Sequence, residues 1–378
     1  MGQNYTAGLF PDNIGDPAIH WEKSIQTDIG LDASFLKGMF TLTADYYIKK
    51  LEDLLGYFPV PSYTGVYGAS IFKNGFSMQD KGLEIAAGYN ETIGKVKFSA
   101  QVNFATLQNK ITKLTDNPDG YVSQSISFSS SGPNNDDNAQ TISRAGSPIA
   151  GFYGYVTDGI FQTDEEAAAS GMGGVKAGDR RFRDLNGDKV VNSADKTILG
   201  NGIPKYTYGI DLRAEYKGFD LSVLLTGQGG AQIANMNKFF LYNMRYMNTT
   251  GLVNGSRDLL NSWHGEGTSN TMPRNDYNAP TSNRFFSSYY IENGAFLRIR
   301  NVQLGYNAPA RLVSSLRTSQ LRVYVAAQNL FTFTKYSGFD PEVGSANIGG
   351  SQNPLTNGVD YGRYPLSRMF MVGISARF

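Results

Sequence analysis

The last residues of the chain constrain its fold most strongly, because they alternate between apolar and polar side chains. In residues 367–378 (SRMFMVGISARF), one parity holds Phe370, Val372, Ile374, Ala376 and Phe378. The other parity holds Met371, Gly373, Ser375 and Arg377. A period of two places these sets on opposite faces of a β-strand. Such a strand fits a membrane barrel with lipid on one side and a polar lumen on the other. Taken alone it also fits the half-buried strand of a soluble β-sandwich, where this alternation is commoner.

The same alternation recurs along the chain in segments that pair through short connections. The predicted hairpins join residues 24–35 to 40–49, 82–89 to 96–104, 205–216 to 219–225, and 295–306 to 321–331. In the fourth hairpin the parity shifts near Arg300 or Asn301, which predicts a β-bulge. With the terminal strand the sequence predicts about nine strands, each near the roughly ten residues that a tilted membrane strand requires.

The connections alternate between short turns within hairpins and long, glycine-rich loops between them. The long connections are residues 51–78, 108–204, 231–294 and 332–366. If the last strand runs towards the periplasm, every short turn lies there and every long loop lies outside, as in outer-membrane barrels. A soluble sandwich gives no reason for this asymmetry, and structureless loops of this length are rare in compact domains. We therefore predict an all-β fold: an antiparallel transmembrane β-barrel, present in part, with long extracellular loops.

The composition excludes several classes of protein. The chain has no apolar run near the length of about 20 residues that a membrane helix needs. Its formal net charge of +1 gives no electrostatic reason to expect nucleic acid as a partner. The absence of cysteine excludes disulfides and thiolate chemistry. The first ten residues (MGQNYTAGLF) lack the basic start and apolar core of a signal peptide, which predicts a cytosolic protein or a beginning that lies elsewhere.

Several longer segments carry a family resemblance. They are residues 16–35 (DPAIHWEKSIQTDIGLDASF), 44–55 (ADYYIKKLEDLL), 146–163 (GSPIAGFYGYVTDGIFQT), 180–219, 321–331 (LRVYVAAQNLF) and 358–378. Together they resemble the SusC/RagA family of TonB-dependent outer-membrane transporters. Residues 180–219 are similar to the most distinctive block of that family, and the resemblance extends nearly from end to end of the chain.

The resemblance implies a barrel of about 22 strands, preceded by a plug domain and a TonB box. Residues 1–378 are expected to be the C-terminal part of such a barrel, about nine or ten strands, without the plug domain or the TonB box. It also implies uptake of glycans or peptides through the outer membrane of a Gram-negative, Bacteroidetes-like bacterium. The implied partners are a SusD-like surface lipoprotein and the TonB complex. The alternative is a secreted or surface-anchored β-rich glycan-binding protein, which would remain soluble without detergent or lipid.

One loop has the spacing of a calcium site. In residues 184–195 (DLNGDKVVNSAD), oxygen ligands fall at positions 1, 3, 5, 7, 9 and 12, where position 7 contributes its backbone carbonyl: Asp184, Asn186, Asp188, Val190, Asn192 and Asp195. This spacing approximates a loop of the EF-hand or dockerin kind, in which hard oxygens wrap one Ca²⁺ ion. Lys189 replaces the glycine that is usual at position 6, and an aspartate replaces the bidentate glutamate at position 12. The alternative is an Asn-Gly turn with solvated acids.

Aromatic side chains gather in the predicted external loops. The candidates for contact with a substrate or with the partner lipoprotein are Tyr63, Tyr67, Phe240, Tyr242, Tyr246 and Tyr289. Amphipathic rings can stack on sugars or pack against a protein surface. The alternative roles are packing within the loops and anchoring at the membrane interface.

The sequence predicts no catalytic residue, and therefore no enzyme. His20 and His264 are the only histidines, and neither has metal-ligand spacing. The paired acids Glu165 and Glu166 could resemble a glycosidase pair, but sequence does not give the separation of two carboxylates in space.

Overall fold

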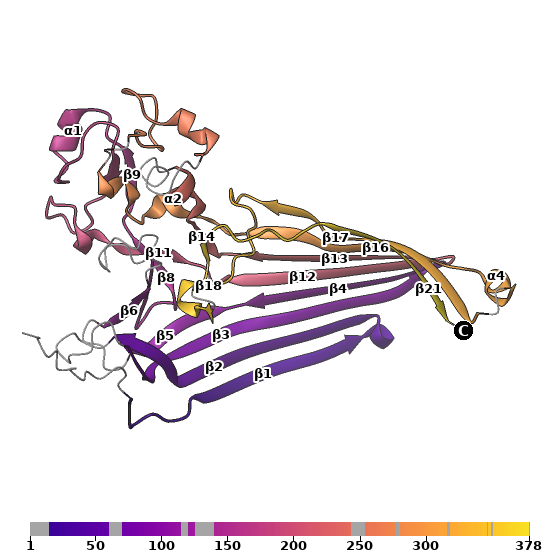
Figure 1. Ribbon diagram of the computed structural model, residues 1–378. Coiled ribbons are helices and arrows are strands. Elements are labelled where there is room, and N and C mark those ends of the chain that lie inside the picture. The colour runs from indigo at the N-terminus through magenta and orange to yellow at the C-terminus, as the bar shows by residue number, and fades with distance from the viewer. Residues whose placement is uncertain are drawn as a thin grey trace, which may run out of the picture.

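One long antiparallel sheet dominates the molecule, as the computed structural model in Figure 1 shows. The structure describes residues 15–59, 70–114, 120–124, 140–242, 254–276, 278, 280–315, 318–345, 347–348 and 351–377. Along the sheet the strands are β1 (Lys23–Phe35), β2 (Phe40–Pro59), β3 (Ser70–Ile93), β4 (Val96–Thr106), β12 (Tyr206–Tyr216), β13 (Phe219–Gly229), β16 (Phe296–Asn307), β17 (Gln320–Thr334) and β21 (Met369–Arg377). A further strand, β5 (Gln108–Leu114), pairs with residues 76–81 of β3. All four predicted hairpins and the terminal strand are confirmed, although β2 and β3 extend well into the predicted loop 51–78.

The hairpin turns are short because their sequences favour left-handed backbone conformations. Lys217 and Gly218 connect β12 to β13 with φ angles of 47° and 87°. Positive φ at both central residues is the signature of a type I′ turn, whose twist matches that of the paired strands. Lys37 and Gly38 have φ angles of 57° and 90° in the β1–β2 connection, the 3₁₀ turn η1 (Leu36–Gly38). In Figure 1 these turns lie at one end of the sheet, together with α4 (Ala310–Ser315) between β16 and β17.

The predicted β-bulge is confirmed at Arg300. On β16 the register against β13 passes from Asn301, opposite Leu224, to Ile299, opposite Leu225. Arg300 is therefore one residue more than the partner strand has at this point. The register against β17 shifts at the same place, where Asn329 has a φ angle of 49°.

The long connections fold into a layer at the opposite end of the sheet, which we call the loop layer (Figure 1). One small sheet contains β6 (Tyr121–Gln124), β7 (Thr141–Arg144), β8 (Gly151–Gly154) and β11 (Thr197–Asn201). The others pair β9 (Thr157–Ile160) with β10 (Arg180–Phe182), β14 (Gln232–Asn235) with β15 (Ile291–Asn293) and β20 (Val359–Asp360), and β18 (Asn347–Ile348) with β19 (Ser351–Gln352). Short helices complete it: α1 (Asp164–Ala168), α2 (Asn237–Leu241), and the 3₁₀ turns η4 (Ser193–Asp195), η5 (Arg257–Asn261), η6 (Thr281–Arg284), η7 (Ser288–Tyr290) and η8 (Pro354–Thr356).

The main hydrophobic core lies in the loop layer and not in the long sheet. Its buried members are Phe152, Ala234, Met236, Phe286, Tyr290 and Val359. These residues come from connections that are far apart in the sequence, so their burial ties the connections together. Within the described part of the chain, none of the helices has both the length and the apolar character to cross a membrane.

Candidate functional site

The long sheet has one apolar face and one polar face. On the apolar face, which we call the outer face, large side chains are exposed on each of the nine strands from β1 to β21 in the sheet order: Ile29, Leu31, Phe35, Phe40, Tyr46, Leu83, Val102, Tyr206, Tyr216, Phe219, Leu221, Leu304, Val323, Val325, Phe331, Phe333, Phe370, Val372 and Ile374. Water-exposed apolar surface of this extent is unfavourable in a soluble monomer. The face presents what a lipid bilayer would cover. The parity predicted for these strands is confirmed in the register of each pair.

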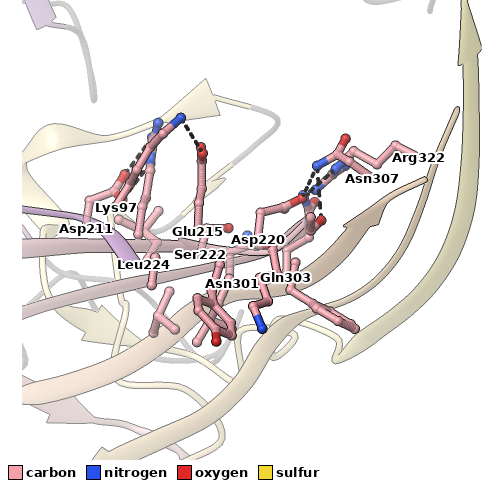
Figure 2. A pocket seen from close by; sticks show the side chains of 18 of the residues that line it. Lys97, Asp211, Glu215, Asp220, Ser222, Leu224, Asn301, Gln303, Asn307 and Arg322 are labelled. Atoms are coloured by element: carbon pink, nitrogen blue, oxygen red, sulfur yellow. Dashed lines mark hydrogen bonds and ion pairs between the residues drawn. The ribbon is translucent and has the colours of Figure 1, made fainter. Parts of the chain in front are cut away.

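The opposite face, which we call the inner face, is hollow and polar near the hairpin turns (Figure 2). Three ion pairs hold its acidic side chains. Asp220 accepts hydrogen bonds from the guanidinium of Arg322, one of them at 3.0 Å, and from the amide of Asn307 at 3.1 Å. Asp211 pairs with Arg213 at 3.0 Å, and Glu215 pairs with Lys97 at 3.3 Å. Each acid that lines this hollow is thus neutralised by a basic partner, which gives a wall rich in hydrogen-bonding groups.

A second hollow lies on the inner face closer to the loop layer. Its polar lining includes Asp45, Glu84, Asn103, Gln228 and Glu342. These side chains come from β2, β3, β4, β13 and the segment after β17, so neighbouring strands contribute to one continuous surface. The inner face therefore offers polar groups along its length to a hydrophilic solute.

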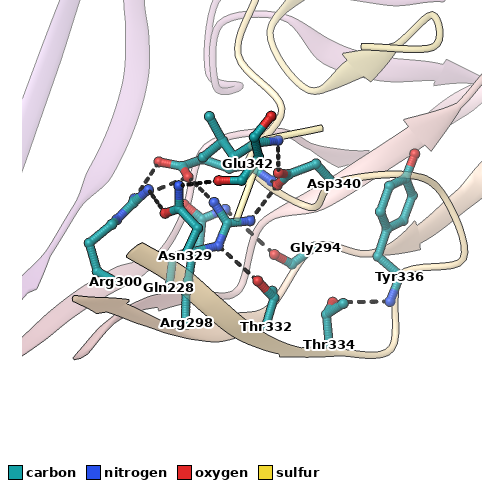
Figure 3. A network of polar contacts seen from close by, with 12 residues as sticks. Gln228, Gly294, Arg298, Arg300, Asn329, Thr332, Thr334, Tyr336, Asp340 and Glu342 are labelled. Atoms are coloured by element: carbon teal, nitrogen blue, oxygen red, sulfur yellow. Dashed lines mark hydrogen bonds and ion pairs between the residues drawn. The ribbon is translucent and has the colours of Figure 1, made fainter. Parts of the chain in front are cut away.

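Residues 335–345, which follow β17, are fastened to the inner face by buried charges (Figure 3). The guanidinium of Arg298 donates to Asp340 at 2.6 Å, to Glu342 at 2.8 Å and to the hydroxyl of Thr332 at 2.8 Å. Arg298 is 2% exposed and Asp340 is 6% exposed. Arg300 reaches the same Glu342 at 2.9 Å. Burial opposes the ionisation of Asp340, but the backbone N–H of Glu342 and the guanidinium of Arg298 outweigh it and lower the pKa of this carboxyl.

A second set of polar contacts joins the same segment to the loop layer. Glu292 accepts hydrogen bonds from the backbone N–H of Ser337 at 2.8 Å and from Lys238 at 2.9 Å. Tyr336 donates its hydroxyl proton to Asp360 at 2.6 Å. Burial raises the pKa of Tyr336, and the hydrogen bond to Asp360 raises it further. This segment therefore connects the inner face of the sheet to the core of the loop layer.

The aromatic residues predicted to contact a ligand have different surroundings. Tyr63, Tyr67 and Tyr246 lie outside the described residues. Phe240 is partly exposed on α2 and makes an edge-on contact with the ring of Phe239, with centroids 5.7 Å apart. Tyr242 donates its hydroxyl proton to Asp258 at 2.5 Å, and burial together with this carboxylate raises the pKa of Tyr242 to about 12.

Tyr289 packs inside the loop layer. The guanidinium carbon of Arg180 lies 3.6 Å from the centre of its ring, and its neighbour Tyr290 meets it edge-on at 5.1 Å. Phe240, Tyr242 and Tyr289 belong to elements that lie together, since Tyr242 and Tyr289 line one cavity with Phe239. Contact of these residues with a substrate or a partner stays a prediction.

The candidate calcium loop is folded by its own side chains. Asp184 accepts hydrogen bonds from the backbone N–H of Gly187 at 2.6 Å and of Lys189 at 2.8 Å. Asp195 is buried and accepts from Leu185 at 2.8 Å and from Asn192 at 2.9 Å. Lys189 has a φ angle of 68°, so it adopts the left-handed conformation for which calcium loops use glycine. Among the residues that the structure describes, no three histidine or acidic side chains are grouped to hold a metal ion.

Calcium binding at residues 184–195 therefore stays a prediction, and titration calorimetry of the protein with calcium chloride tests it. We expect saturable binding in the range of about 10⁻⁴–10⁻³ M that is typical of extracellular calcium modules. Asp184→Asn should weaken it at least about tenfold, because a carboxylate ligand is lost. Asp158→Asn, in β9 and outside the loop, serves as the control and should bind as the wild type does. Absence of saturable heat in the wild type would contradict the prediction.

Each of the two histidines contacts a nearby oxygen atom. Nε2 of His20 lies 3.2 Å from the carboxylate of Asp53, in an exposed pair. Nδ1 of His264 lies 2.9 Å from the carbonyl oxygen of Ser262, and the ring of the neighbouring Trp263 donates to Gln162 at 3.2 Å.

An antiparallel sheet with an apolar outer face, a polar inner face, short turns at one end and folded loops at the other is part of the wall of a membrane β-barrel. Comparison with known proteins identifies the kind of barrel. The chain is 31% identical to TonB-dependent receptor P3 of Formosa agariphila over 382 residues, which covers 100% of this chain and 36% of that receptor. It is 28% identical to the TonB-dependent receptor SusC of Bacteroides thetaiotaomicron over 374 residues, covering 95% of this chain and 32% of SusC.

The solved structures agree with these relatives. A structure of the RagAB peptide transporter matches with a TM-score of 0.75 and 26% identity, over 96% of this chain and 36% of that one. No protein-family model matches the chain. The chain spans about a third of the length of the curated relatives that it matches. The resemblance to the SusC/RagA family of TonB-dependent transporters is thus confirmed, and so is the partial antiparallel barrel.

Proposed function

We propose that this chain forms part of the wall and the external loops of an outer-membrane TonB-dependent importer of the SusC type. The observation that carries the proposal is the combination of a lipid-compatible outer face with a polar inner face along the same strands. Curated relatives named as TonB-dependent receptors support it, as does the structural likeness to a peptide transporter. In this proposal the inner face borders the path of a hydrophilic nutrient.

The loop layer is the proposed surface for the nutrient and for a SusD-like surface lipoprotein. It lies at the end of the sheet opposite the hairpin turns, where a barrel of this class faces the outside (Figure 1). Its connections are packed around a core of their own, so they form an ordered surface that a rigid partner can recognise. The nutrient is proposed to be a glycan or a peptide, and the TonB complex is proposed to supply the energy.

The proposed function is tested in the native host by fractionation and by growth. We expect the protein in the outer-membrane fraction, released only by detergent, with a SusD-like lipoprotein copurifying from the extract. A strain that lacks the gene should lose growth on at least one glycan or peptide mixture supplied as sole carbon source. Recovery of the protein in soluble form without detergent would contradict the importer and support the secreted glycan-binding alternative.

A further inference from the structure

A small cavity in the loop layer is lined by four basic side chains. It has a volume of about 40 Å³ and lies between β10, α2 and residues 273–276 and 280–290. The basic residues that line it are Arg180, Lys238, Arg274 and Arg284. A void of this size has room for a small polar group such as a carboxylate, because about 10–15 Å³ of such cavity volume already holds one water molecule.

Two of these cations already have acidic partners. Lys238 lies 2.9 Å from a carboxylate oxygen of Glu292. Arg274 donates to Asp179 at 2.7 Å and also pairs with Asp276. Their charges are neutralised, so they shape the cavity without adding excess positive charge.

Arg180 differs because its guanidinium is buried without an acidic partner among the described residues. The residue is 3% exposed, and its Nε has no hydrogen-bond partner in the described part of the chain. Its guanidinium carbon lies 3.6 Å from the ring centre of Tyr289, a cation–π contact that stabilises the charge only in part. A buried cation without a counter-ion is costly, and a bound anion would supply the missing partner.

A hydrogen bond holds the backbone of Arg180, and the burial of the residue restricts its side chain. Its N–H donates to Oδ1 of Asn283 at 2.7 Å, and Nδ2 of Asn283 donates to the buried carboxylate of Asp179 at 2.9 Å. A guanidinium in a fixed position offers a planar pair of N–H donors that matches the two oxygens of a carboxylate. The rings of Tyr242 and Phe239 line the same cavity and can contact the remainder of a ligand.

We propose that Arg180 binds a carboxylate group of the imported nutrient, so that the importer prefers an acidic ligand. The inference rests on the proposed function, since it names the chemistry of the ligand at the external loops. Two kinds of nutrient carry such a carboxylate: a peptide carries it at its C-terminus, and an acidic glycan carries it on a uronic acid.

Two pairs of probes separate these sources in binding measurements on the whole chain in detergent. One pair is a tripeptide with a free C-terminus and the same tripeptide with a C-terminal amide. The other is trigalacturonic acid and neutral galactotriose. We expect one acidic probe to bind at least about tenfold more tightly than its neutral counterpart, as charge-assisted hydrogen bonds to a buried guanidinium require. Equal affinity within both pairs, or no binding of either acidic probe at millimolar concentration, overturns the proposal.

Substitutions of Arg180 test whether this residue causes the preference for the acidic probe over the neutral one. Arg180→Gln should abolish it, and Arg180→Lys should retain only part of it because the planar pair of donors is lost. Arg183→Gln is the matched control, since Arg183 lies nearby in sequence and makes an exposed contact of 3.7 Å with Asp158. This control should keep the preference in full. A preference that survives in Arg180→Gln overturns the proposal.

A second measurement uses the wild type alone and does not depend on the folding of a variant. Hydrogen exchange with the acidic probe should slow in residues 237–242 and 280–290, and unchanged exchange overturns the proposal. The outcome is distinguishable from that of the proposed function. A protein found in the outer membrane that supports growth but shows no acidic preference refutes only the carboxylate site.

Discussion

Replacing Val372 by arginine is expected to destabilise the membrane-inserted protein by about 2–4 kcal/mol, the cost of a cation at the middle of a bilayer. Val372 is the residue of interest because it is 82% exposed on the outer face and lies near the middle of β21. A charge there loses its hydration when the strand enters lipid. Urea titration of the protein in lipid vesicles measures this loss of stability, with resistance to protease as the readout of the folded fraction.

Ser375→Arg is the matched control for this prediction. Ser375 lies on the same strand with the opposite parity, on the inner face, where Arg322 is its partner in the β17 register. An arginine there remains in contact with water, so we expect a change in stability below about 1 kcal/mol. Equal losses for the two variants would show that both faces of β21 meet the same environment, and the membrane assignment of the outer face would be wrong.

Arg298→Met is the second change with a large expected effect. It leaves the carboxylate of Asp340 buried without its counter-ion, which costs about 3–5 kcal/mol when a buried ion pair loses one member. The cost should appear as local release of residues 335–345, because Asp340 and Glu342 fasten this segment to the inner face. Hydrogen exchange and limited proteolysis of that segment provide the measurement.

Two further variants separate this ion pair from a general loss of packing. Arg300→Met removes a cation whose partner Glu342 has a side chain that is 41% exposed, so the expected loss is below about 1 kcal/mol. The double variant Arg298→Met with Asp340→Leu removes both buried charges and should recover most of the stability. If residues 335–345 are released as readily in the double variant as in Arg298→Met, the buried ion pair is not what holds this segment.

The long strands were predictable because a sheet with lipid on one side and water on the other imposes a strict period of two. Lys217-Gly218 and Lys37-Gly38 mark their turns, and the parity shift near Arg300 marks the bulge. The part of β2 after Leu51 and the part of β3 before Met78 were not predicted, because their pairing register is irregular and the alternation of apolar and polar residues is lost there.

The loop layer could not be predicted because its contacts join residues that are remote in sequence. Ala234 of β14 pairs with Val359 of β20, and the hydroxyl of Thr141 donates to the carbonyl oxygen of Leu355 at 2.5 Å. No local pattern encodes such pairs, and the core that they enclose is assembled from single residues of many connections. The candidate calcium loop could be proposed from the sequence because its candidate ligands lie within one short segment, residues 184–195. The roles of Arg180, Arg298 and Asp340 depend on contacts with residues that are distant in the sequence.

The bulge on β16 decides where two arginines point. On the regular part of the strand, Val302 and Leu304 face outward, and unbroken alternation would turn the even-numbered Arg298 and Arg300 the same way. The surplus residue at Arg300 reverses which face the preceding side chains occupy. The guanidinium groups of Arg298 and Arg300 therefore lie on the aqueous inner face and not on the lipid-facing outer face. Straightening the strand here with every residue retained would act on side-chain facing as a frameshift acts on codons, and would turn Arg298 toward the bilayer. Deleting Arg300 alone would leave Arg298 facing inward, because the surplus residue itself is then lost.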